Sequence, residues 1–166
     1  YPLWWDSHVY LGIGKYIFSE GKTGIWEPFR PLLHPILLGL FWKLNLNALL
    51  FGKLLDVIFS LLSVYLVYRL AEGLYGKRAA LFAGLLFSLN PVFIIFTGLV
   101  LTEPLALVLG LSGMWLFFRR TESARSHPSY LYLYFSGLLF GLSFLTKFPQ
   151  GMLFGGALLI IIFHPE

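Results

Sequence analysis

The sequence AALFAGLLFSLNPVFIIFTGLVLTEPL, residues 79–105, decides the fold class. It begins with an apolar run that extends to Leu99 and is interrupted at Asn90-Pro91. We expect a helix with a kink or break there, because proline lacks a backbone donor and its ring clashes with the preceding turn. The run leads to Thr102-Glu103-Pro104, which has the pattern of a helix start. This stretch therefore predicts two apolar helices joined by a short polar hairpin.

The composition of the whole chain indicates a membrane protein. Of its 166 residues, 58% are hydrophobic and 12% are charged, and the mean hydropathy is +0.78. An ordinary soluble domain has about 25% charged residues. The absence of cysteine excludes disulfides, thiolate metal sites and cysteine nucleophiles. The net charge of +4 comes from scattered basic residues, which membrane orientation explains better than nucleic-acid binding, so we expect no nucleic-acid partner.

Further apolar runs lie on both sides of this stretch. Residues 49–71 are long enough to cross a hydrocarbon core of ~30 Å at about 1.5 Å per residue. Shorter runs follow at residues 105–118, 130–146 and 151–163. We therefore expect an all-α, polytopic transmembrane helix bundle with about five spans, two of them short or incomplete. No signal-peptide pattern is visible, and we expect the chain to be a piece of a longer polytopic protein.

The first 48 residues differ from the rest because they are amphipathic. After Asp6, apolar residues recur at helical spacing, and Gly21 follows where a helix stop is expected. The aromatic residues of this segment suit the level of the lipid headgroups. We expect residues 1–48 to form an extracytoplasmic loop with interfacial helices, within a single membrane domain that also contains the spans.

The basic residues predict an orientation. Loops around residues 69–78 and 119–127 hold six of the twelve lysines and arginines, whereas the hairpin at Glu103 holds none. Since cytoplasmic loops carry an excess of basic residues, we expect these two loops to be cytoplasmic. Strict alternation of the spans then places residues 1–45, Glu103 and Lys147 together on the outer face.

Two isolated carboxylates, Asp6 and Glu103, are the main candidates for chemistry. Each has a structural explanation: Asp6 as the N-cap of the first helix, and Glu103 in a first turn that Thr102 caps. Each also has a functional explanation, as a general base or metal ligand at the membrane interface. Glu103 is the only ionisable residue between Arg78 and Arg119, and charges that border spans tend to mark function.

The neighbouring cations and histidines are further candidates. Arg30 and Lys147 either extend to lipid headgroups or bind the phosphate of a substrate. His8 and His34, together with the two carboxylates, are candidate ligands of a divalent metal, although no recognised ligand spacing links them.

Lys53 and Asp56 are spaced three residues apart, on one helix face. The simplest interpretation is a local ion pair or a polar contact inside the bundle.

Several short motifs occur in a fixed order and together carry a resemblance. They are Trp5-Asp6-Ser7-His8-Val9-Tyr10, RPLLHP at 30–35, GKRA at 76–79, Ser88-Leu89-Asn90-Pro91, Thr102-Glu103-Pro104-Leu105 and GLLFGLSFLTK at 137–147. In this order the chain resembles the N-terminal half of GT-C glycosyltransferases. The group is that of dolichyl- or polyprenyl-phosphate-mannose-protein mannosyltransferases and aminoarabinose-transferase-like enzymes.

The resemblance implies inverting transfer of a sugar from a polyprenyl- or dolichyl-phosphate donor to a protein, lipid or glycan acceptor. Asp6 would be a base or metal ligand, and Glu103 a second site residue. Arg30 and Lys147 would neutralise the leaving lipid phosphate. The family often has two adjacent acids in the first loop, whereas Ser7 follows the aspartate here. The location would be the bilayer of a prokaryotic plasma membrane or an ER-type membrane, with the site on the extracytoplasmic face.

Two other classes remain open. A transporter or channel fragment would use Asp56, Glu103 and Lys53 to line a polar path, but transport sites are expected near the midplane and these residues lie near span ends. A scaffold subunit that has lost catalysis is the other alternative. The piece of chain at hand would also be inactive if the reaction needs the rest of the protein.

Overall fold

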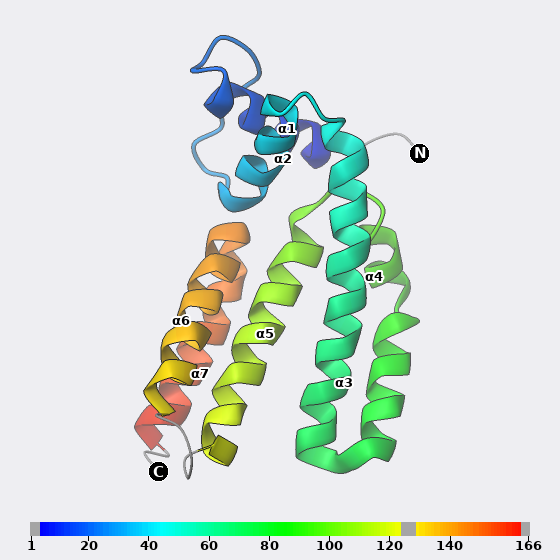
Figure 1. The fold of residues 1–166 in the computed structure, drawn as a ribbon, viewed down its shortest axis with the longest axis vertical. Helices are drawn as coiled ribbons and strands as arrows, with labels where there is room; N and C mark the ends of the chain where they lie inside the picture. Colours follow the sequence, from blue (N-terminus) through cyan, green and yellow to red (C-terminus); the bar gives the residue numbers. More distant parts are fainter. Residues whose placement is uncertain (1–3, 124–128, 164–166) are drawn as a thin grey trace.

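The computed structural model describes residues 4–123 and 129–163, and every regular element in these ranges is helical (Figure 1). The elements are α1 (Trp5–Phe18), α2 (Leu33–Lys43), α3 (Ala48–Ser88), α4 (Pro91–Phe96), α5 (Thr102–Ser123), α6 (Ser129–Thr146), the 3-10 turn η1 (Phe148–Gln150) and α7 (Gly151–Phe163). The expectation of an all-α fold is confirmed for the described residues.

The chain reverses direction where the sequence carries glycine and proline. Helix α3 runs away from α1 and α2 as far as Gly76, whose φ of 81° breaks the helix, and the segment after it returns (Figure 1). The break expected at Asn90-Pro91 is confirmed. Asn90 caps α4 by accepting hydrogen bonds from the backbone N–H groups of Val92 and Phe93, and Pro91 occupies the first turn.

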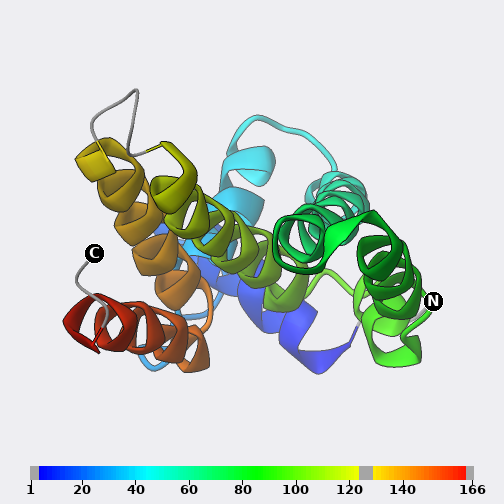
Figure 2. The same cartoon turned by 90° about the horizontal axis from the view of Figure 1, so that it is seen from below.

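The remaining helices alternate in direction. Helix α5 runs away from the end that holds α1 and α2, α6 returns to it, and α7 runs away again (Figures 1 and 2). The starts of α1 and α5 and the turn between α6 and α7 therefore lie at one end of the bundle. The Gly76 turn and the end of α5 lie at the other. Arg125, which contributed to the predicted orientation, lies outside the described residues.

One described helix, α3, is long and apolar enough to cross a membrane by length and composition. Two shorter apolar helices lie at Tyr130–Thr146 and Phe148–Phe163. Helical segments occupy all five of the expected span positions. Repeated crossing of a bilayer by these segments stays a prediction.

Two buried apolar clusters fix the end of the bundle that carries α1. The first consists of Tyr10, Leu38, Val100 and Leu101, and it joins α1 and α2 to the loop before α5. The second consists of Leu66, Leu105 and Val108, and it joins α3 to α5. The start of α5 is thus packed between the first two helices and α3.

Helices α5 and α6 are joined by buried serines. Ser136 Oγ donates a hydrogen bond to the Gly113 carbonyl, and Ser143 Oγ donates one to the Ala106 carbonyl, each at 2.8 Å. Such interhelical hydrogen bonds are typical of helix contacts within membranes. They hold α6 in register with α5, and so bring the end of α6 to the start of α5.

Candidate functional site

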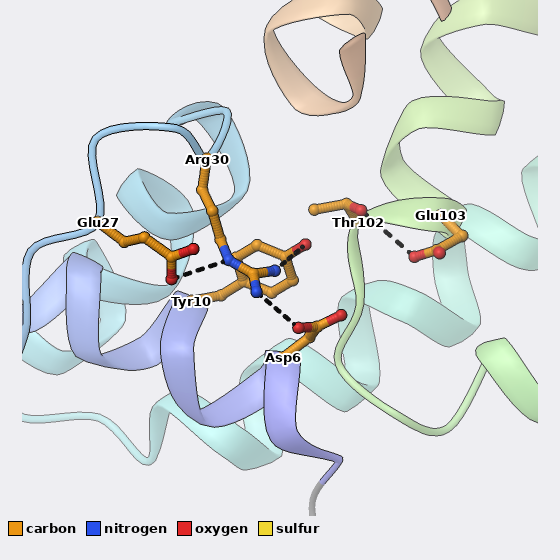
Figure 3. A network of polar contacts seen from close by, with 6 residues as sticks. All are labelled: Asp6, Tyr10, Glu27, Arg30, Thr102 and Glu103. Atoms are coloured by element: carbon orange, nitrogen blue, oxygen red, sulfur yellow. Dashed lines mark hydrogen bonds and ion pairs between the residues drawn. The ribbon is translucent and has the colours of Figure 1, made fainter. Parts of the chain in front are cut away.

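Asp6 lies in the first turn of α1 and forms an ion pair with Arg30 (Figure 3). The distance from Arg30 Nη2 to Asp6 Oδ1 is 2.8 Å. The N-cap interpretation of Asp6 is wrong, because α1 begins at Trp5 and its N-cap, Trp4, makes no capping side-chain bond. The Asp6 side chain is 37% exposed, so the carboxylate is both anchored by a cation and open to a second molecule.

Arg30 is held by three partners (Figure 3). Its Nε lies 3.1 Å from Glu27 Oε2, and its Nη1 donates to Tyr10 Oη at 3.3 Å. The guanidinium also lies over the Tyr10 ring, 5.2 Å from its centroid. Burial alone would lower the pKa of Arg30, but the hydrogen bonds with Tyr10, Asp6 and Glu27 outweigh burial and leave the pKa raised. Arg30 therefore stays a cation and fixes the orientation of Asp6.

Sequence reasoning did not select Glu27 or Tyr10 as site residues. The signals were present, because Tyr10 follows Asp6 by four positions on a helix and Glu27 precedes Arg30 by three. The spacing does not predict the conformation of the loop between α1 and α2, and it is this conformation that brings Arg30 over α1.

Glu103 and Lys147 form the second ion pair. Lys147 Nζ lies 2.7 Å from Glu103 Oε1, although 44 positions separate the two residues. Thr102 Oγ1 donates to Glu103 Oε2 at 3.3 Å (Figure 3). Thr102 is the first residue of α5 rather than a cap outside it. These contacts show that Glu103 and Lys147 lie together, as expected, and their position on the outer face of a membrane stays a prediction.

A cavity of about 250 Å³ lies beside this second pair. Most of its wall is apolar, and its polar lining comes from the ion pair and two amide side chains. The lining residues are Phe87, Asn90, Val92, Phe93, Phe96, Glu103, Leu107, Lys147 and Gln150. The cavity thus combines the Glu103–Lys147 ion pair with apolar side chains that suit an apolar ligand chain.

Ser7 connects the two ion pairs. Its side chain is fully buried, and its Oγ donates a hydrogen bond to the Leu99 carbonyl, in the loop that precedes Glu103. Asp6 and Glu103 do not contact each other directly. Instead, each carboxylate has its own cation, and Ser7 ties the start of α1 to the loop that leads into α5, which carries Glu103.

The two histidines lie in different surroundings. His8 is exposed on α1, whereas His34 is buried and packs edge-on against Tyr10 at 5.3 Å between ring centroids. The Nδ1 of His34 has no hydrogen-bond partner among the residues that the structure describes. Within residues 4–123 and 129–163, no three His, Asp or Glu side chains gather closely enough to hold a metal ion. The four residues named as candidate metal ligands therefore do not form a common donor set in these ranges.

We predict that His34 makes the native state less stable in acid. Burial lowers the pKa of His34 from 6.5 to about 4, so the folded protein keeps the ring neutral while the unfolded chain takes up a proton. Stability should therefore fall as the pH drops from about 6.5 towards 4, by on the order of 3 kcal/mol at most. Thermal unfolding between pH 7 and 4 should show this slope in the parent and a flatter one in His34→Gln. The control, His8→Gln, should keep the parent slope, and equal slopes in all three would contradict the assignment.

A second cavity, of about 320 Å³, lies at the opposite end of the bundle. Arg69 and Arg119 line it, together with Glu72 and Trp115. Arg69 forms an ion pair with Glu72 at 3.4 Å, and Arg119 lies over the Trp115 ring at 4.5 Å. None of the residues that the sequence predicts to be catalytic, phosphate-binding or metal-ligating lines this cavity.

Comparison with known proteins yields one family match. A family model described as dolichyl-phosphate-mannose-protein mannosyltransferase matches residues 29–166, which is most of the chain. The matched region contains Arg30, Glu103 and Lys147 and begins after Asp6. No curated protein and no solved structure matches the chain.

Proposed function

Because the chain belongs to the dolichyl-phosphate-mannose-protein mannosyltransferase family, we propose that it is part of an integral-membrane glycosyltransferase. In this proposal it transfers a sugar, with inversion, from a polyprenyl- or dolichyl-phosphate donor to a protein, lipid or glycan acceptor. The family is membrane-embedded. We propose that the reaction takes place on the extracytoplasmic face, at the end of the bundle where α1 and α5 begin.

The observation that carries this proposal is the pairing of two carboxylates with two cations at one end of the bundle. Asp6 pairs with Arg30 at 2.8 Å, and Glu103 pairs with Lys147 at 2.7 Å. Transfer from a lipid phosphate needs a base for the acceptor hydroxyl and positive charge for the departing phosphate. Both requirements can be met here by residues that the fold holds in place.

The proposed reaction is a single displacement. The acceptor oxygen attacks the anomeric carbon from the side opposite the phosphate, and the Asp6 carboxylate accepts the acceptor proton. The bond between the anomeric carbon and the phosphate oxygen breaks, and the lipid phosphate leaves with the bonding electrons. A phosphate is stabilised by cations and needs no general acid to leave. Inversion at the anomeric carbon follows from the opposite positions of acceptor and leaving group.

The two cations differ in how free they are to bind phosphate. Arg30 already has three partners, so its main role is to orient Asp6. Within the part of the chain that the structure describes, Lys147 pairs only with Glu103; its side chain is 37% exposed and lines the apolar cavity beside Glu103. An ammonium group has three donors, so Lys147 can bind a phosphate oxygen while it keeps its ion pair with Glu103. The adjoining cavity would take the first isoprene units of the donor.

The transporter alternative finds less support in the contacts. Asp56 hydrogen-bonds the backbone of the loop before α5, and none of the ion pairs found in the described residues includes Lys53. The expected local pair of Lys53 with Asp56 is wrong, and the polar contact inside the bundle is the correct alternative.

Lys147→Met tests the proposal. Without the ammonium group the donor phosphate loses the cation proposed to bind it, and we expect kcat/KM for the lipid donor to fall by about 10²-fold, since removal of one such stabilising group typically costs this much. Lys147→Arg should restore part of the loss. The measurement is transfer of labelled mannose from a polyprenyl-phosphate donor by the full-length protein in liposomes.

The matched control is Lys22→Met, which removes an exposed lysine from the loop after α1. It should transfer mannose at the parent rate. A parent protein that cannot use any polyprenyl-phosphate sugar would contradict the proposed function. Equal activity of Lys147→Met and Lys22→Met would remove Lys147 from the site.

A further inference from the structure

Asp56 is a buried carboxylate that belongs to neither ion pair. It lies on α3, and only 1% of the residue is exposed. Its carboxylate faces the backbone N–H groups of Val100 and Leu101, which hydrogen-bond one of its oxygens, whereas Asp56 Oδ2 has no hydrogen-bond partner among the described residues. A buried carboxylate is costly unless it is hydrogen-bonded, so these contacts hold the loop against α3.

The loop that Asp56 contacts is strained. Val100 has a φ of 55°, in the left-handed region that a β-branched residue rarely adopts. Such a conformation persists only where the surrounding structure enforces it, and it is often found at functional sites. Val100 is fully buried, so the strain is confined to a position with close neighbours on every side.

Three contacts enforce this conformation. Asp56 binds the two amides, and Ser7 Oγ donates to the Leu99 carbonyl from the other side. Gly52 leaves room for the Val100 side chain, because a Cβ built at Gly52 would lie 2.8 Å from Val100 Cγ1. The loop is therefore clamped between α3 and the first turn of α1, which carries Asp6.

We propose that Asp56 is a positioning residue that acts through the Val100–Leu101 backbone to hold Glu103 in a fixed place relative to Asp6. Glu103 follows the clamped amides by two residues, so any movement of the loop moves its carboxylate and its ion pair with Lys147. The catalytic importance of this position rests on the proposed function. The clamp on the loop rests on the contacts alone.

The test uses two readouts on the full-length protein with all other cysteines removed. Spin labels are attached at Lys15→Cys on α1 and Gly98→Cys, an exposed position where an added Cβ meets nothing within 4 Å. Pulsed electron paramagnetic resonance then measures the distribution of distances between α1 and the loop. Sugar transfer gives kcat and KM for a polyprenyl-phosphate-mannose donor.

Asp56→Ala should broaden the distance distribution and lower kcat by about tenfold to a hundredfold, because a displacement of about 1 Å is enough for such losses. KM for the donor should change little, since Lys147 and the apolar cavity remain. Asp56→Asn keeps one acceptor oxygen and should lie between Asp56→Ala and the parent. If Asp56→Ala does not fold, Asp56→Asn is compared with the parent in both readouts instead.

The control is Ser63→Ala, which removes a fully buried polar group from the same helix. Ser63 Oγ donates to the Phe59 carbonyl of its own helix and so makes its hydrogen bond within α3 rather than to the loop. This variant should match the parent in both readouts. A narrow, parent-like distribution in Asp56→Ala would overturn the clamp, and a broadened distribution with unchanged kcat would overturn its role in catalysis. An inactive parent would contradict the proposed function, while the distance distribution would still decide the clamp.

Discussion

Asp6→Asn is expected to lower kcat for sugar transfer by about 10² to 10⁴-fold, the usual contribution of a general base. Asparagine keeps the shape of the side chain and an oxygen that can accept from Arg30, but it cannot take a proton from the acceptor. KM for the donor should change little, because the proposed phosphate ligand, Lys147, is unchanged. The measurement is the rate of mannose transfer at saturating donor in the full-length protein.

A matched control for this variant is Glu20→Gln, which neutralises an exposed carboxylate just after α1. It should retain the parent rate. Thermal unfolding of Asp6→Asn should stay near that of the parent, because a partly exposed ion pair contributes about 1 kcal/mol or less. Full activity of folded Asp6→Asn would remove Asp6 from the role of base.

Glu103→Gln is expected to reduce kcat/KM by about 10²-fold or more. The change removes the charge that places Lys147, so the ammonium group loses its fixed position beside the cavity. If the two residues act as a unit, the double variant Glu103→Gln/Lys147→Met should be little worse than either single variant. The readout is kcat/KM for the lipid donor in all three variants.

The control for the second variant is Glu72→Gln, which breaks the ion pair with Arg69 at the opposite end of the bundle. It should leave kcat/KM unchanged. Strictly multiplicative losses in the double variant would show that Glu103 and Lys147 act independently, and this would contradict the assignment of the pair as one phosphate-binding unit.

Local sequence signals predicted much of the fold because local chemistry determines those features. Pro91 cannot continue the preceding helix, because proline lacks a backbone donor and is tolerated only in a first turn, and the expected break is present. The stop expected near Gly21 is also present, since α1 ends at Phe18 and Gly21 has a φ of 80°. The grouping of Asp6, Glu103 and Lys147 at one end followed from the alternation of helix directions.

The contacts of the site were not predictable in the same way, because they depend on loops and on long-range packing. Spacing places Lys53 and Asp56 on one helix face, but it does not show that Asp56 faces the loop before α5. Residue spacing also does not show that the loop between α1 and α2 places Arg30 over α1. The N-cap interpretation of Asp6 failed because the helix starts at Trp5, two residues earlier than a cap at Asp6 requires, and the carboxylate pairs with the Arg30 guanidinium instead.

The most direct test is a structure of the full-length protein with bound polyprenyl phosphate. We expect the phosphate within hydrogen-bonding distance of Lys147 Nζ, with the isoprenoid chain in the adjoining cavity and the Asp6 carboxylate at the same end of the bundle. A phosphate bound instead at the opposite end, in the cavity lined by Arg69 and Arg119, would contradict it.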